Sequence, residues 1–229
     1  MFSLCIPTIN RYDDFLSKYL PLYLDNEHID EIIISDENGE DAKKISQNFP
    51  NSKIKLNVNK QRLGPFLNKI VCCKLAKNEW IALIDSDNFA DVQYFHTCKN
   101  YINNSTLDKN TILAPEFAKP NFNYTHLSGR IINKNTLKDI DKYEISIQKQ
   151  NIHETLMNTG NYVLNKYLID NINIENEKNN IQYSAACDVI YFNTLLFEQL
   201  NCNIHVIPGM QYKHVVHDGS IYLEARHAT

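Results

Sequence analysis

Short apolar runs and helix-period segments alternate through the first half of the chain. Apolar residues at three- and four-residue spacing predict helices over about Asp13–Leu24 and Gly64–Lys77. Four runs are predicted to form strands: Phe2–Ile6, Ile32–Ser35, Lys53–Val58 and Trp80–Ile84. The second run is β-branched without alternation, which is typical of a strand covered on both faces. This order indicates an α/β domain built on a parallel sheet.

The second half has a looser pattern. Thr111–Ala114 is predicted to be a strand, and Pro115, Pro120 and nearby Asn and aromatic residues predict a long loop before Arg130–Ile132. No pattern is readable over about 137–158. Three further elements are predicted: a strand at Asn161–Leu164, a helix at Ala185–Leu200 and a strand at Ile204–Val216.

Composition narrows the class. A chain of 229 residues with 43% apolar and 22% charged residues fits one large globular domain. The net charge of −4, without any Lys/Arg run, lacks the signature of polyanion binding, so no nucleic-acid partner is expected. No apolar run approaches the roughly 20 residues that cross a bilayer, and the start of the chain lacks a signal-peptide pattern.

These features predict a cytoplasmic protein without a transmembrane segment. Heavy use of Asn, Ile and Lys points to a bacterial cell or a virus-infected host. The six cysteines are scattered without a C-x-x-C pair, so they are expected to be reduced and mostly buried.

Two carboxylates follow the fourth predicted strand. Asp85 and Asp87 stand at its carboxyl end, which is where open α/β sheets bind ligands. Residues two apart on an extended segment point to the same side, so both could face one hard cation such as Mg²⁺ or Mn²⁺. The alternative for an Asp at a strand end is a turn or a helix cap. The position after a buried strand favours a ligand site.

Four motifs occur in a characteristic order: Ile6–Arg11, Ile34–Gly39, Asn59–Asn68 and Asp85–Asp87. Together they make the chain resemble the nucleotide-sugar glycosyltransferases with the GT-A fold, in particular the large family 2 type, over roughly Phe2–Phe95. The resemblance implies an α/β fold: a Rossmann-like, mostly parallel sheet flanked by helices, with a smaller mixed acceptor-side region. It also implies a single domain over residues 1–229, with a nucleotide-sugar-binding half at 1–110 and an acceptor-binding half at 111–229.

The resemblance implies a metal-dependent donor site. Asp87 would be the direct ligand of Mn²⁺ or Mg²⁺, and Asp85 would contact the metal through water or the ribose. The residues implied in binding the donor are Pro7, Thr8, Asn10, Arg11, Asp36, Arg62, Asn68, Asp85 and Ser86.

Several of these donor residues have a plain structural alternative. Thr8, Asn10 and Asp36 follow strands one and two, within reach of a uracil-like base and ribose, but turn and cap chemistry explains each equally well. Arg62 and Lys60 precede a predicted helix, where a positive helix end and basic side chains favour a diphosphate. Solvated surface charge is the alternative for both.

Two further motifs are similar to the family's acceptor-binding residues. Inverting members of the family place a proton-accepting carboxylate at the start of a helix in the second half. Asp188 matches it, although Cys187 stands where the family usually has an acidic residue, and helix capping is the alternative. Met157–Tyr162 is similar to the family's acceptor-side turn, where a glycine lets the backbone approach the sugar.

Two histidines near the C-terminal end complete the implied metal site. His214 and His217 are similar to the tail in which GT-A enzymes place a third metal ligand or a phosphate contact. Three residues apart on an extended segment, they would face opposite sides, so only one is expected to reach the metal.

The resemblance therefore implies an enzyme that transfers a sugar from a nucleotide-diphosphate donor, UDP-linked by family frequency, to a hydroxyl of a glycan or glycoconjugate. Inversion with Asp188 as general base is expected. One alternative is a catalytically inactive GT-A-like module that binds nucleotide or glycan. Another is a sugar-phosphate nucleotidyltransferase, which should carry a glycine-rich loop after the first strand, and none is present.

Overall fold

The structure of the chain is a computed structural model that describes residues 1–136, 160–175 and 188–217. The predictions for the unpatterned stretch 137–158, for Met157–Thr159 and for Ala185–Cys187 fall outside the described residues.

A single sheet of nine strands organises the described residues, in the order β3-β2-β1-β4-β8-β5-β9-β7 with β6 paired to β5. Neighbours among β1 to β4 run parallel, whereas β8 is antiparallel to both β4 and β5. The strands are β1 (Phe2–Thr8), β2 (Ile29–Asp36), β3 (Ile54–Val58), β4 (Trp80–Leu83), β5 (Thr111–Lys119), β6 (Phe122–Asn123), β7 (Ile131–Ile132), β8 (Tyr162–Asn165) and β9 (Asn203–Lys213). The mostly parallel sheet with a mixed region on one side confirms the predicted fold class.

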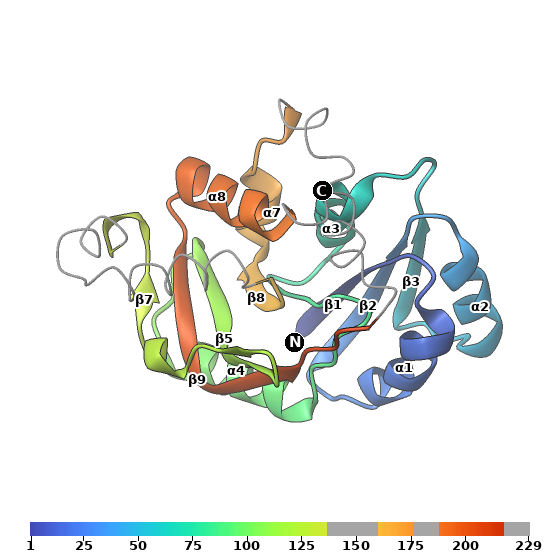
Figure 1. Cartoon of the computed structure of the whole chain (residues 1–229), viewed down its shortest axis with the longest axis horizontal. Coiled ribbons are helices and arrows are strands. Elements are labelled where there is room, and N and C mark those ends of the chain that lie inside the picture. The colour runs from blue at the N-terminus through green and yellow to red at the C-terminus, as the bar shows by residue number, and fades with distance from the viewer. Residues whose placement is uncertain (137–159, 176–187, 218–229) are drawn as a thin grey trace.

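Helices cover both faces of this sheet. In Figure 1, α3, α7 and α8 lie above the sheet, and α1 and α4 lie below it. The helices are α1 (Ser17–Leu24), α2 (Glu40–Asn48), α3 (Gly64–Lys74), α4 (Val92–Asn104), α7 (Lys166–Asn171) and α8 (Asp188–Leu200). A π-helical turn at Tyr12–Leu16 precedes α1, and a 3₁₀ turn lies at Thr125–Leu127.

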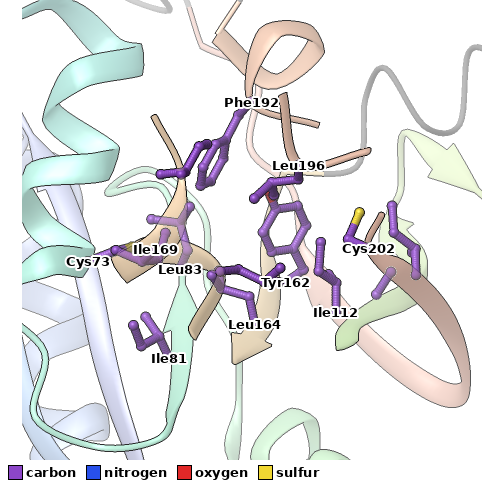
Figure 2. Close-up of a cluster of buried hydrophobic side chains, with 14 of the residues drawn as sticks. Cys73, Ile81, Leu83, Ile112, Tyr162, Leu164, Ile169, Phe192, Leu196 and Cys202 are labelled. Atoms are coloured by element: carbon purple, nitrogen blue, oxygen red, sulfur yellow. The ribbon is translucent and has the colours of Figure 1, made fainter. Parts of the chain in front are cut away.

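Alternate residues of the strands feed two separate hydrophobic cores. Phe2, Leu4 and Ile6 of β1 pack with residues of α1, α2 and α4, because successive side chains of a strand point to opposite faces. Cys5 of β1 belongs to the other core, with residues of α3, α7 and α8. Figure 2 shows part of this second core around Tyr162 of β8. The continuous apolar runs in the sequence therefore reflect strands that are buried on both faces.

One sequence-based prediction about the sheet was wrong. Pro115 does not begin a loop, because β5 continues through it to Lys119 and pairs with β9. The register between β5 and β9 shifts between Pro115 and Phe117. Such a bulge tolerates a proline, which cannot donate a ladder hydrogen bond.

Five of the six cysteines lie in the described residues, and Cys187 does not. All five are buried and free, which confirms the prediction for them. Within the described residues no helix is both long and apolar enough to span a membrane. The cytoplasmic location stays a prediction.

Glu31 forms a buried polar junction at the opposite edge of the sheet from the strand ends that carry the motifs. Its carboxylate accepts hydrogen bonds from the Ser3 hydroxyl at 2.5 Å and the Lys77 amide at 2.7 Å. It also accepts from the Lys55 ammonium at 2.6 Å. Burial raises the pKa of Glu31, but these three donors outweigh it, so the pKa lies below its ordinary value.

Glu31→Gln is therefore expected to lower the free energy of unfolding by about 1–3 kcal/mol at pH 7, because an amide cannot accept from all three donors. A lowered folded-state pKa stabilises the protein above the unfolded-state pKa, and this stabilisation is lost as the pH falls through the folded value. The difference from wild type should thus shrink below about pH 4. Urea unfolding at pH 7 and pH 3.5 measures it, with the exposed Glu27→Gln as control. An equal loss at both pH values would contradict the assignment.

Candidate active site

The carboxyl ends of β1, β2 and β4 meet at one edge of the sheet. Thr8 and Asp36, the last residues of β1 and β2, are register partners. β4 pairs with the other side of β1 and is followed by Asp85. The parallel register therefore brings three of the four sequence motifs to one edge, as the strand order predicts.

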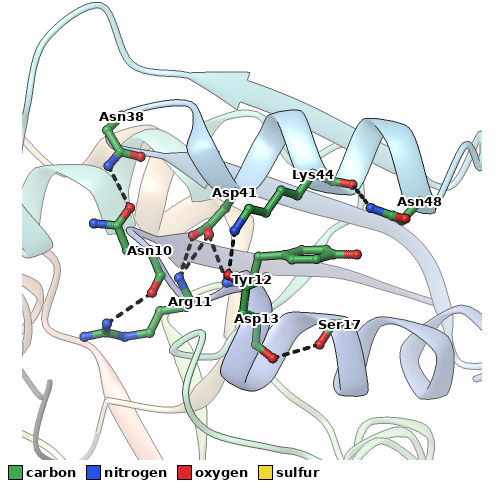
Figure 3. A network of polar contacts seen from close by, with 9 residues as sticks. All are labelled: Asn10, Arg11, Tyr12, Asp13, Ser17, Asn38, Asp41, Lys44 and Asn48. Atoms are coloured by element: carbon green, nitrogen blue, oxygen red, sulfur yellow. Dashed lines mark hydrogen bonds and ion pairs between the residues drawn. The ribbon is translucent and has the colours of Figure 1, made fainter.

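The turn after β1 is held by an acidic residue that the sequence analysis did not identify. Asp41, in the first turn of α2, accepts the Thr8 hydroxyl at 2.6 Å. It also accepts the backbone N–H groups of Arg11 at 3.0 Å and Tyr12 at 2.9 Å. Figure 3 shows Asp41 pointing into this turn. No helix was predicted at this position, and nothing in the sequence connected Asp41 to a loop 30 residues earlier.

Two asparagine side chains lie at the exposed rim of the same turn. Asn10 has a left-handed backbone with φ of 54°, a conformation that Asn adopts more readily than most residues. The Asn38 side-chain amide donates to Asn10 Oδ1 at 2.9 Å. This pair presents polar groups to solvent beside the ends of β1 and β2 (Figure 3).

Asp36 is fully buried, and both of its carboxylate oxygens accept backbone hydrogen bonds. Oδ1 accepts from Asn38 at 3.2 Å and Oδ2 from Ala42 at 2.8 Å. These contacts are the turn and cap chemistry that was the alternative for this residue. A base contact by Asp36 stays a prediction, and Pro7 is likewise buried within β1.

The loop before α3 is tied to β2 by side chains. Asn68 is buried, donates to the Ser35 carbonyl at 3.0 Å and accepts from Asn59 at 2.9 Å. Glu37 accepts the Leu63 N–H at 2.7 Å, and burial raises the pKa of Glu37. Arg62 is exposed in this loop, so its side chain is accessible to a ligand.

The Asp85-Ser86-Asp87 motif forms a turn rather than an extended segment. The Asn88 N–H donates to the Asp85 carbonyl at 3.0 Å, and Ser86 is buried. The expectation that both carboxylates face one side assumed an extended segment, which the structure does not have. A shared cation contact by the two carboxylates stays a prediction. In the turn, the carboxylates of Asp85 and Asp87 have different partners.

Asp85 is clamped by Asn161, the residue before β8. The Asp85 N–H donates to Asn161 Oδ1 at 2.7 Å, and the Asn161 side-chain amide donates back to Asp85 Oδ2 at 3.1 Å. Asn161 is itself buried, and its carbonyl accepts the Tyr94 hydroxyl at 3.2 Å. The position of Asp85 is thus set by groups in the protein interior.

Asp87 points to the segment that follows β9. Its Oδ2 lies 3.2 Å from His217 Nε2, and each side chain is 21% exposed. Burial raises the pKa of Asp87, and the nearby Asp85 carboxylate raises it further, while His217 acts in the opposite direction. The His217 ring also packs on Phe15, with ring centroids 4.9 Å apart.

His214 and His217 lie beyond the end of β9, not on the strand predicted to reach Val216. The Val215 N–H donates to Asn88 Oδ1 at 3.0 Å, which fixes this segment against the Asp87 turn. His214 Nδ1 lies 2.7 Å from Asn121 Nδ2, and burial lowers the pKa of His214, while the carboxylates of Asp87 and Asp85 act in the opposite direction. Of the two histidines, His217 is the one in contact with Asp87.

A buried lysine that the sequence analysis missed joins the two halves of the site. The Lys69 ammonium of α3 lies 2.9 Å from Asp85 Oδ1 and 2.6 Å from Asp188 Oδ2. Burial lowers the pKa of Lys69, but the carboxylates of Asp188 and Asp85 outweigh it, so its pKa lies above the ordinary value. Asp188, at the start of α8, is thereby brought to the same edge as the Asp85 turn.

Gly160 lets the start of α8 approach this edge. A Cβ at Gly160 would lie 2.7 Å from a methyl group of Val189, closer than two carbon atoms pack. The absence of a side chain at position 160 therefore permits close contact with α8, which is a packing reason for the glycine in addition to the sugar approach expected from the sequence.

The fold defines a structural class: the sheet and its helices are arranged as in the GT-A fold. The chain belongs to glycosyl transferase family 2, whose model matches residues 3–163. No match was found among curated protein sequences.

Solved structures of S. aureus TarS share the fold. The structure of TarS 1-349 has a TM-score of 0.63 and 19% identity, covering 92% of this chain and 59% of that one. The complex of TarS 1-349 with UDP-GlcNAc has a TM-score of 0.66 at 17% identity, covering 98% and 61%. The complex with UDP has a TM-score of 0.64 at 16% identity, covering 98% and 62%. The chain therefore spans about three fifths of the length of these 1-349 chains and 38% of the length of a longer TarS chain.

Proposed function

We propose that the chain transfers a sugar from a UDP-linked donor to a hydroxyl of a glycan or glycoconjugate, with inversion at the sugar carbon. The supporting observation is the meeting, at one sheet edge, of Asp87 beside His217 and of Asp188 beside Lys69. Residues 1–110 would form the donor half and 111–229 the acceptor half of one domain. The TarS complexes with UDP and UDP-GlcNAc support a UDP-linked donor on this fold.

The residues around Asp87 suit a hard divalent cation, Mn²⁺ or Mg²⁺. Asp87 and His217 offer an oxygen and a nitrogen ligand on neighbouring segments. Among the described residues, no three His, Cys, Asp or Glu side chains cluster as metal ligands. Sites shared with substrate phosphates need only one or two protein carboxylates, so the pair is sufficient. When bound, such a cation neutralises the charge that develops on a departing diphosphate.

The acceptor chemistry is assigned to Asp188. In the proposed reaction the acceptor hydroxyl gives its proton to the Asp188 carboxylate while its oxygen bonds to the anomeric carbon. The bond from that carbon to the β-phosphate oxygen breaks, and UDP leaves with the electron pair. Asp188 Oδ2 is engaged by Lys69, so we assign the proton to Oδ1.

The direct test is a thermal-shift screen of nucleotides and nucleotide sugars, each with and without Mn²⁺, followed by a nucleotide-release assay. UDP and one UDP-sugar are expected to raise the melting temperature in the presence of Mn²⁺, in proportion to their affinity for the folded chain. Release of UDP should follow on addition of acceptor. Tight UDP binding without turnover of any donor would favour the inactive binding module instead, and no shift by any nucleotide would reject both.

A further inference from the structure

Lys69 occupies a position where an apolar residue would be expected. It lies on the buried face of α3, and its side chain is only 6% exposed. Phe66 and Ile70 of the same helix belong to the core beneath α8. Burying an ammonium group carries a large desolvation penalty unless opposite charges and hydrogen bonds compensate it. Here Asp85 and Asp188 do so, which makes Lys69 the link between a strand end and a helix start.

The two ends of this link differ in how firmly they are held. Asp85 is fixed by the reciprocal hydrogen bonds with Asn161, as described above. Asp188 opens α8, which rests on α3 through Phe66, whose ring centroid lies 6.3 Å from those of Tyr191 and Phe192. These apolar contacts set the place of the helix, but only a polar partner can orient a carboxylate at its end. The Lys69 ammonium is that polar partner, and it is itself held by the fixed Asp85 carboxylate.

We propose that Lys69 is a positioning residue, which is anchored on Asp85 and holds the Asp188 carboxylate in the orientation needed to accept the acceptor's proton. The inference rests on the proposed function of Asp188. It gives Asp85 the task of anchoring Lys69 and leaves the direct cation contact to Asp87. Since Oδ1 and Oδ2 of Asp85 each have a protein partner, this division agrees with the contacts at the turn.

The test compares Lys69→Met, Lys69→Arg and the double variant Lys69→Met/Asp85→Asn with wild type. Lys69→Met should lower kcat for transfer at least about 10²-fold, because misplacement of a catalytic group by about 1 Å has an effect of that size. The donor KM should change little, and Lys69→Arg should recover part of kcat. The control is Lys77→Met, which removes an exposed lysine paired with Asp30 and should leave kcat unchanged.

The double variant distinguishes two roles of Lys69: orienting the Asp188 carboxylate, and neutralising the charge of Asp85 and Asp188. Removing Lys69 leaves the buried Asp188 and the partly exposed Asp85 without their shared cation, so Lys69→Met should melt at a lower temperature, and Asp85→Asn should restore part of that loss. If Lys69 positions Asp188, kcat stays low in the double variant although the melting temperature recovers. Should kcat recover with stability, or should Lys69→Met raise only the donor KM, the proposal is wrong. If Lys69→Met does not fold, the double variant and Lys69→Arg decide by the same comparison.

This outcome is distinct from a failure of the proposed function. A wild-type chain that turns over no donor would reject the function itself. An active wild type with an equally active Lys69→Met would reject only the role of Lys69.

Discussion

Replacing Asp87 with alanine is expected to slow nucleotide release from the sugar donor about 10²- to 10⁴-fold, because a divalent cation at this step contributes several kcal/mol. Asp87 is partly exposed at the strand-end edge and faces His217, so its carboxylate is placed to bind a cation from solvent. The loss should appear in kcat at saturating donor, and the Mn²⁺ concentration needed for half-maximal rate should rise. Both are measured by UDP release across a Mn²⁺ titration.

The matched control is Asp91→Ala, in the same stretch of chain. Asp91 accepts the Tyr94 N–H at 3.0 Å and caps α4, so its loss should reduce stability by about 1 kcal/mol without changing the rate. A folded Asp87→Ala protein that releases nucleotide at the wild-type rate would show that the cation, if any, binds elsewhere.

The sheet could be predicted from the sequence where burial dictates the pattern. Ile32 to Ser35 is buried on both faces in β2, and β-branched residues occupy the consecutive positions Ile32 to Ile34. The helix α3 was also predicted, because its apolar residues repeat on one face. By contrast, α2 was missed, since only Asp41, Ala42 and Ile45 of its nine residues are buried and the stripe is too short to register as helical periodicity.

The site residues at the strand ends could be predicted from the sequence. The residues that contact them from distant parts of the chain could not. Asp85 and Asp87 stood out because they follow a buried strand. Lys69 did not, because a lysine next to apolar residues in a helix normally lies at the surface. Its burial depends on Asp188, which is 119 residues away in the chain. Pairings over such distances are decided by the tertiary fold and leave no local pattern.

The turn at Asp85 to Asn88 illustrates the same limit on a smaller scale. A D-x-D sequence is compatible with an extended segment or with a turn, and the two conformations orient the carboxylates differently. Here the choice is fixed by Asn161 on one side and by Val215 on the other. Both come from the second half of the chain, where the pattern of apolar residues was least informative.

Replacing Asp188 with asparagine is expected to lower kcat for transfer about 10²- to 10⁴-fold, the usual contribution of a positioned general base. Asparagine has nearly the same shape, and its side-chain oxygen can still accept from Lys69, so α8 should keep its place. It is also favoured at helix starts. Donor affinity, measured by calorimetry with UDP and Mn²⁺, should therefore change little, which separates loss of the base from loss of the site.

The exposed pair of Lys166 and Asp170, 2.6 Å apart on α7, provides the control, because Asp170→Asn breaks a carboxylate–lysine contact of the same kind outside the site. That variant should transfer sugar at the wild-type rate, since an exposed pair contributes at most about 1 kcal/mol to stability. The anomeric configuration of the wild-type product, measured by NMR, shows whether the sugar is transferred with inversion. An inverted product together with an inactive Asp188→Asn chain identifies Asp188 as the base, whereas a retained configuration or an undiminished kcat in Asp188→Asn would assign proton transfer to another group.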